Sequence, residues 1–144
     1  MLHVITSTLD DLCSLIKDDP VRPEIPLAAR IHDWAEIFVL VDQGQPLAVT
    51  CVRYTDSVPR SVADLSHTLQ PTVAVFYTIW SYHPGSGRQL IRAAQLYQRQ
   101  HRPSITRWVT LSPKTDMARL FHHRNGAVTL QENTETVNYE YSIS

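Results

Sequence analysis

Apolar and polar residues alternate in a pattern that predicts mainly strands in the first half of the chain. Leu2–Ser7 alternates enough to form a short strand, and Leu9–Lys17 has its apolar residues at helical spacing. Asp18–Pro26 contains three prolines, so we expect an extended connector there. Glu36–Asp42 and Gln45–Tyr54 are rich in β-branched and aromatic residues and flank a short glycine-containing turn. These two segments predict a β-hairpin.

The second half contains the strongest strand and the clearest helix of the pattern. Thr72–Tyr82 is almost continuously apolar and aromatic, which is typical of a strand that is buried on both faces. A helix with one apolar face follows it and ends before Pro103. The pattern also predicts a short helix within Val62–Leu69, a strand over Ile105–Leu111, a helix over Thr115–Asn125, and a final strand pair over Val128–Gln131 and Thr136–Ser142. Because strand and helix alternate after Thr72, we expect an α/β sheet with at least one parallel strand pair.

Composition narrows the class of protein without identifying it. The chain has 144 residues, which fit one domain (1–144) with one core, and 43% of them are hydrophobic. Its formal net charge of −1 gives no overall attraction to nucleic acid or to an anionic membrane. Cys13 and Cys51 are too few for a disulfide framework. The start of the chain does not resemble a secretory signal, and the apolar run Ile37–Val41 is too short to span a bilayer. We therefore expect a cytoplasmic protein without a membrane partner.

The turn between the Thr72–Tyr82 strand and the next helix has the features of a phosphate site. Gly85 and Gly87 let the backbone approach a ligand closely, and the first N–H groups of the helix lack partners. Arg88 adds a full positive charge. The turn is neither a Walker loop nor a dinucleotide fingerprint, because the Lys-Ser/Thr pair and the third glycine are absent. A tight turn in which Ser86 helps to cap the helix explains the same residues, and that alternative stays open.

Two segments carry a resemblance to the GNAT superfamily of acyl-CoA-dependent N-acyltransferases. Thr72–Arg88 resembles its central motif, in which a splayed strand leads into a Gln/Arg-x-x-Gly-x-Gly/Ala loop that holds the cofactor's pyrophosphate. Both glycines are present, but Tyr82 stands in place of the Gln or Arg. Ala118–Ala127 is similar to the second motif, with the same number of residues from alanine to glycine. Ser112–Ala127 and Thr136–Tyr141 also resemble small acetyltransferase-like proteins of tailed bacteriophages.

The resemblance implies a fold and a cofactor. The fold would be a GNAT-like mixed central sheet of about six to seven strands flanked by about four helices. Acetyl-CoA would be the co-substrate, and the acceptor would be an amine on a small molecule or a protein. The residues expected at the cofactor are Ile79, Trp80, Ser81, Tyr82, Gly85, Ser86, Gly87, Arg88 and Thr115.

Catalytic residues follow less directly from the resemblance. His122 matches the tyrosine that often protonates the leaving thiolate, although a packing or exposed histidine is the alternative. Tyr77 and Glu36, together with Asp56, are candidates for the general base because they lie on or near strands that flank the cleft of this fold. Tyr139 and Tyr141 either line the acceptor site or pack in the core.

Several other functions stay open or are disfavoured. Adjacent His122 and His123 point about 100° apart on a helix, so we expect no metal site. A row of arginines on the predicted helix, Arg88, Arg92 and Arg99, could contact nucleic acid, but a solvent-exposed helix face explains it equally well. We therefore expect no nucleic-acid partner. Exposed strand edges leave a homodimer open. The main rival is a GNAT-shaped protein that has lost catalysis and acts by binding, for example a phage-encoded inhibitor of a host protein or a virion component.

Overall fold

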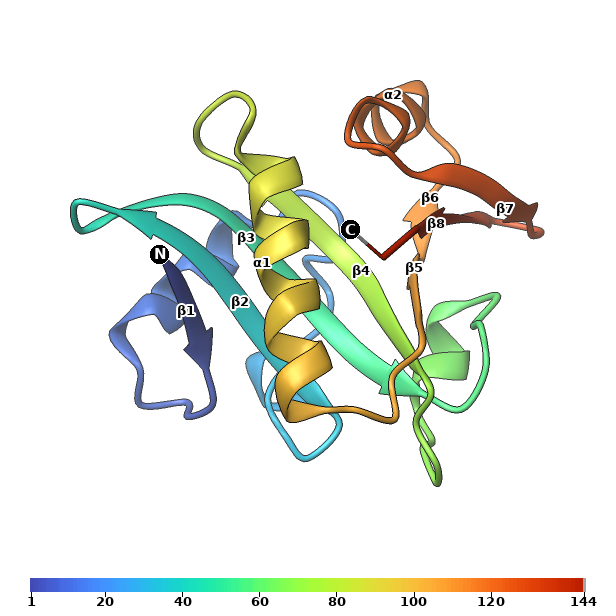
Figure 1. Ribbon diagram of the computed structural model, residues 1–144, viewed down its shortest axis with the longest axis horizontal. Coiled ribbons are helices and arrows are strands. Elements are labelled where there is room, and N and C mark those ends of the chain that lie inside the picture. The colour runs from blue at the N-terminus through green and yellow to red at the C-terminus, as the bar shows by residue number, and fades with distance from the viewer. Residues whose placement is uncertain (144) are drawn as a thin grey trace.

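One mixed sheet of eight strands organises the computed structural model, which describes residues 1–143 (Figure 1). The strand order is β1-β2-β3-β4-β5-β8-β6, and β7 also pairs with β8. β4 and β5 run parallel, because the helix α1 carries the chain back across the sheet between them. The strands are β1 (Leu2–Ile5), β2 (Ala35–Asp42), β3 (Gln45–Thr55), β4 (Val73–Ser81), β5 (Arg107–Thr110), β6 (Ser112–Pro113), β7 (Val128–Glu132) and β8 (Thr136–Tyr141).

Two α-helices and three 3₁₀ segments accompany the sheet. The helices are α1 (Ser86–His101) and α2 (Asp116–Arg124), and the 3₁₀ segments are η1 (Asp11–Asp18), η2 (Leu27–Ala29) and η3 (Val62–Leu65). Figure 1 shows α1 lying along one face of the sheet, with α2 beside β7 at the far end. The structure describes no helix that is both long enough and apolar enough to cross a membrane.

Both faces of the central strands are buried, as the apolar run of β4 predicts. On the α1 face, Phe38 and Phe76 pack with helix residues that include Leu90. On the opposite face, Ile37 and Val75 pack beneath η1 and the loop that follows it. The alternation of neighbouring β2 and β4 residues between these two clusters follows from the two-residue repeat of a strand.

The fold class agrees with the sequence prediction, but the numbers of elements differ. The sequence predicted one strand over Ile105–Leu111. In the structure the pairing with β8 breaks after β5 and resumes at the two-residue strand β6, which is the eighth strand. At the break, the Thr110 side chain accepts the Tyr139 amide, and its carbonyl accepts the Asn138 side chain. These bonds replace the regular ladder. The helix expected over Leu9–Lys17 is a 3₁₀ segment that begins at Asp11, so two α-helices are present where about four helices were expected.

Candidate active site

The parallel pair β4–β5 holds together over only part of its length. Val73–Phe76 pairs with Arg107–Thr110, and the Leu111 amide still donates to the Phe76 carbonyl at 3.2 Å. Beyond that point β4 pairs with β3 but not with β5. The two strands therefore diverge, and the edge of β4 toward β5 is open from Tyr77 onward.

A β-bulge marks the start of this divergence. On β3, Cys51 lies opposite Thr78, and the next residue, Val52, lies opposite Phe76. Tyr77 is therefore the extra residue of β4. A bulge bends its strand and increases the local twist, which accounts for the turn of β4 away from β5. The sequence gives no sign of the bulge, because the apolar run continues through it.

The loop after β4 leaves the start of α1 open. Gly85 has a left-handed backbone with a φ of 84° and is the N-cap residue, and no side chain caps the helix. The Ser86 hydroxyl instead donates toward the carbonyls of His83 (2.6 Å) and Leu47 (3.0 Å), which ties the loop to the start of β3. Ser86 therefore does not fill the role of a helix cap. The uncapped N–H groups favour an anion at this end of α1.

Helix α2 lies against this loop from the β5 side of the opening. A Cβ atom on Gly87 would stand 2.7 Å from Cζ of Phe121, so only glycine fits there without a shift of the ring. Arg88 donates from Nη2 to the carbonyl of Arg124 at 2.8 Å, near the C-terminus of α2. The guanidinium of Arg88 is thereby held close to the start of α1.

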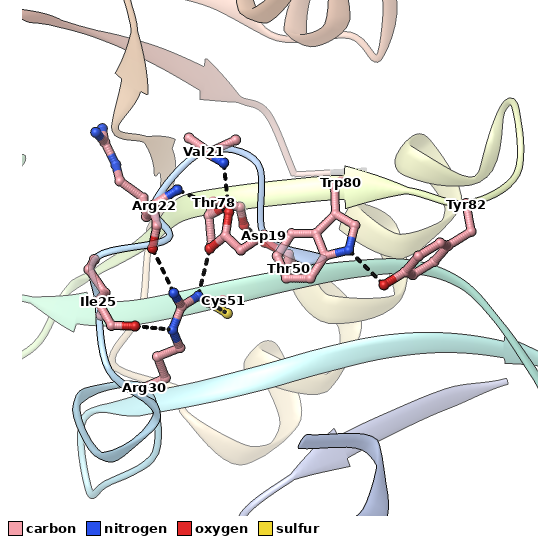
Figure 2. Close-up of polar contacts among 10 residues, drawn as sticks. All are labelled: Asp19, Val21, Arg22, Ile25, Arg30, Thr50, Cys51, Thr78, Trp80 and Tyr82. Atoms are coloured by element: carbon pink, nitrogen blue, oxygen red, sulfur yellow. Dashed lines mark hydrogen bonds and ion pairs between the residues drawn. The ribbon is translucent and has the colours of Figure 1, made fainter. Parts of the chain in front are cut away.

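Tyr82 points away from the place where a pyrophosphate ligand would stand. Its hydroxyl accepts from Nε1 of Trp80 at 3.0 Å (Figure 2). The same hydroxyl donates to the Asp18 carboxylate at 2.7 Å. The tyrosine thus joins β4 to η1 on the face opposite α1. Thr115, also expected at the cofactor, caps α2 by accepting the Ala118 amide at 3.1 Å.

His122 is buried, although the sequence presents it within a polar run. Only 4% of its surface is exposed, its Nδ1 lies 2.8 Å from the Tyr141 hydroxyl, and its ring stacks on Tyr139. Burial, with a smaller contribution from the charge of His123, lowers the pKa of His122 to about 4. At neutral pH the imidazole is therefore uncharged and hydrogen-bonded to a tyrosine.

The structure does not bring the three expected catalytic side chains together. Glu36 lies on the α1 face, where it accepts hydrogen bonds from the Tyr54 hydroxyl (2.6 Å) and from Nε of Arg102 (2.9 Å). Arg102 directly follows α1, so this carboxylate belongs to the end of the helix that lies away from Gly85. Tyr77 lies on the opposite face, and its buried hydroxyl has no hydrogen-bond partner within residues 1–143.

A buried ion pair beside the bulge was missed by the sequence analysis. Asp19 and Arg30 meet at 2.7 Å with side chains that are fully buried, and Asp19 also accepts the Thr78 hydroxyl at 2.7 Å (Figure 2). Burial alone would raise the pKa of the Asp19 carboxyl, but hydrogen bonds from the Arg22 amide, Arg30 and Thr78 hold that pKa below its ordinary value. No spacing in a proline-rich loop signals such a pair.

The surface has two hollows, one on each side of the sheet's central strands. The larger has a volume of about 940 Å³, a size that suits a small molecule, and is lined by Arg22, by residues 60–63 and by residues 131–136. The smaller, about 510 Å³, lies around Trp34 and Arg102. The larger hollow adjoins the open end of β5, because Arg22 reaches the carbonyl of Leu111. Residues 1–143 form no cluster of three or more side chains suited to hold a metal ion.

Comparison with solved structures decides the fold. The GNAT domain of PAT from S. lividans matches 99% of this chain over 89% of its own length, with a TM-score of 0.66 and 14% identity. A Bacillus subtilis acetyltransferase in complex with CoA matches with the same TM-score over 99% of this chain and 98% of its own, at 11% identity. The chain has the GNAT fold.

A second group of structural neighbours is more similar in sequence. Malonyl-CoA decarboxylase from Agrobacterium vitis has a TM-score of 0.68 and 26% identity over 84% of this chain. The chain spans only 35% of the length of that enzyme. No protein-family model matches the sequence, and no curated protein does.

Proposed function

We propose that this protein binds an acyl-CoA where β4 and β5 diverge and transfers its acetyl group to an amine. The observation that carries the proposal is the bulged, half-open β4 leading into the uncapped start of α1. In support, the B. subtilis neighbour is in complex with CoA, and an Elizabethkingia anophelis neighbour has acetyl-CoA bound.

The residues of the open edge suit the parts of such a cofactor. The Gly87 and Arg88 amides at the start of α1, together with the Arg88 charge, suit the pyrophosphate, whereas the Ser86 amide already donates to the His83 carbonyl. The backbone of Ile79–Ser81 is free on its β5 side to pair with the pantetheine arm and to donate to the thioester oxygen. Acetyl-CoA, when bound, supplies the activated acetyl group.

The titratable side chains have distinct parts in this proposal. Acetyl transfer requires that the amine lose a proton, that an oxyanion be stabilised and that a thiolate be protonated. His122 and Tyr141 form a hydrogen-bonded pair in which the neutral imidazole, a weak base with a pKa of about 4, orients the Tyr141 hydroxyl toward the leaving thiolate. Burial raises the pKa of Tyr77 well above its usual value, so Tyr77 acts as a hydrogen-bond donor rather than a base. Glu36 supports the fold through Arg102.

A second candidate function is decarboxylation of a malonyl thioester. Malonyl-CoA decarboxylases from three bacteria match at 26%, 19% and 22% identity, against 10–14% for the acetyltransferases. In that reaction the bond to the carboxylate carbon breaks, CO₂ leaves, and the resulting thioester enolate takes up a proton at carbon. The reaction needs the same oxyanion donors and a proton source but no amine.

Calorimetric titration of acetyl-CoA and malonyl-CoA into the purified protein tests both candidates, with Gly87→Trp as the control. Micromolar binding that the variant abolishes would support the cofactor site. Mass spectrometry of the products then separates transfer, which yields free CoA and an acetylated amine, from decarboxylation, which yields acetyl-CoA. His122→Phe should slow either reaction while leaving binding in place. No heat and no thermal shift with either thioester would rule out the enzyme and favour the non-catalytic alternative, a binding protein such as a phage-encoded inhibitor.

A further inference from the structure

The loop over Asp19–Arg30 presents one charged side chain, that of Arg22, that forms no ion pair within residues 1–143. The Arg22 amide donates to the Asp19 carboxylate at 3.0 Å, and the Arg22 carbonyl accepts from Nη2 of Arg30 at 2.7 Å. Both backbone groups of Arg22 are therefore held by the two members of the buried ion pair. In Figure 2 the guanidinium of Arg22 points away from that pair. The fixed backbone sets the direction in which the side chain leaves the loop, and the bond from Nη2 to the Leu111 carbonyl holds its far end.

The charge of Arg22 lacks a counter-ion. Its Nη2 donates to the Leu111 carbonyl at 3.0 Å, but its Nε is buried with no partner within residues 1–143, and no carboxylate in that range lies within salt-bridge distance of its guanidinium. A half-buried guanidinium that is not neutralised costs free energy. Burial lowers the pKa of Arg22, partly offset by the more distant charges of Glu24 and Asp19. Within residues 1–143, the hydrogen bond to Leu111 offsets only part of this cost.

The position of Arg22 relates this charge to the proposed reaction. Leu111 directly follows β5, at the level where β4 and β5 part, and Asp19 contacts Thr78 at the β4 bulge. The loop thus spans the opening from one strand to the other on the face opposite α1. Arg22 also lines the 940 Å³ hollow. A group that enters the opening from this face meets the Arg22 guanidinium.

We propose that Arg22 binds a carboxylate of the substrate in this hollow. The planar guanidinium has no carboxylate partner within residues 1–143, and its set of N–H groups suits the two oxygens of a carboxylate. The inference rests on the proposed function, since the carboxylate belongs either to the acyl group, as in malonyl-CoA, or to the amine acceptor, as in an amino acid. The protein is therefore selective for a carboxylate-bearing substrate.

The test compares wild type with Arg22→Gln and with the matched control Arg60→Gln, whose exposed arginine lines the same hollow. One arm titrates malonyl-CoA and acetyl-CoA by calorimetry. The other measures thermal shifts of the CoA-saturated protein with each common amino acid and with the amine that lacks its carboxylate. In one of these two arms, wild type should bind the carboxylate-bearing probe about tenfold or more tightly than its partner without the carboxylate. Arg22→Gln should reduce this ratio of affinities to about twofold or less. Arg60→Gln should retain it, and acetyl-CoA affinity should be the same in all three proteins.

The outcomes separate this inference from the proposed function. Acetyl-CoA binding without a carboxylate preference in either arm overturns the role of Arg22 and leaves the acyl-CoA site intact, whereas no acetyl-CoA binding by wild type overturns the proposed function. A preference that survives in Arg22→Gln, or that is lost only in Arg60→Gln, also overturns the role of Arg22. Urea unfolding supplies an independent readout: if Arg22 serves to bind a ligand, Arg22→Gln should shift the urea midpoint only slightly, because only the hydrogen bond to Leu111 is lost. A large fall in the urea midpoint would instead make Arg22 a structural residue.

Discussion

His122 illustrates how its surroundings set the chemistry of a single side chain. In the sequence it is one of two adjacent histidines before an arginine, which suggests a solvated face. In the fold it lies on the buried side of α2, against Tyr139 and Tyr141 of β8, and burial lowers its pKa to about 4. The spacing of the second motif was enough to identify His122 as a candidate catalytic residue. It could not indicate the burial, because burial depends on the packing of α2 against β8.

The lowered pKa of His122 predicts how stability depends on pH. Above pH 6.5 the imidazole is neutral in both the folded and the unfolded chain, and its burial carries no penalty. Below pH 6.5 the unfolded chain binds a proton that the folded chain excludes until about pH 4. The free energy of unfolding should therefore fall by about 1.4 kcal/mol per pH unit over that range, about 3 kcal/mol in total. Urea titrations of wild type and His122→Gln between pH 7 and pH 4 measure this term.

The control for that measurement is His67→Gln, whose histidine is exposed and lies on a different segment from His122. This variant should keep the wild-type decline, and His122→Gln should show a shallower one. Parallel curves for wild type and His122→Gln would contradict the assignment of a buried neutral imidazole.

The Asp19–Arg30 pair predicts a large loss of stability when one partner is removed. Asp19→Ala leaves the fully buried Arg30 guanidinium without its carboxylate, which should lower the free energy of unfolding by about 3–5 kcal/mol. The double variant Asp19→Ala/Arg30→Met should lose less than the sum of the single losses, because no charge is left uncompensated. Urea unfolding of the set measures the coupling. Asp116→Ala, which breaks an exposed pair with Arg119, should show no comparable loss, and equal losses at both sites would contradict this account.

At the scale of elements, the contact between α1 and α2 predicts a steric coupling. Gly87→Ala places a methyl group 2.7 Å from the Phe121 ring, so α2 must shift and the start of α1 must open. The variant should lose stability and bind acyl-CoA more weakly. Adding Phe121→Ala removes the obstruction, and the double variant should recover part of both losses, as a thermodynamic cycle measures. Strict additivity would show that the two residues do not constrain each other.

The elements were predictable where local pattern alone determines them. The hairpin of β2 and β3, the buried strand β4 and the helix α1 follow from hydrophobic periodicity and from the glycines that punctuate it. The bulge at Tyr77 and the break between β5 and β6 were not predictable, since each depends on bonds to another strand. For the same reason the sequence indicated the Gly85–Gly87 loop but not the anchored loop that carries Arg22.

The whole molecule consists of two half-sheets joined at a short seam. β1 to β4 pair along most of their lengths, whereas β5, a strand of four residues, connects them to β8 and through β8 to β6 and β7. Bonds outside the sheet also bridge the halves, as when Asn138 donates to the carbonyl of Pro59. A ligand in the opening would contact both halves, so its binding should stabilise the short β4–β5 pairing that joins them.

Hydrogen exchange with and without CoA measures that effect. Amides of β5 and of the open part of β4 should exchange more slowly with CoA, since their exchange proceeds by local opening of the short seam. Amides of β2, paired on both sides in the larger half, should change little unless they exchange by global unfolding, which ligand also suppresses. Gly87→Trp should abolish the protection. Uniform slowing across the sheet would mean that the seam does not open independently, and the two half-sheets would then unfold as one cooperative unit.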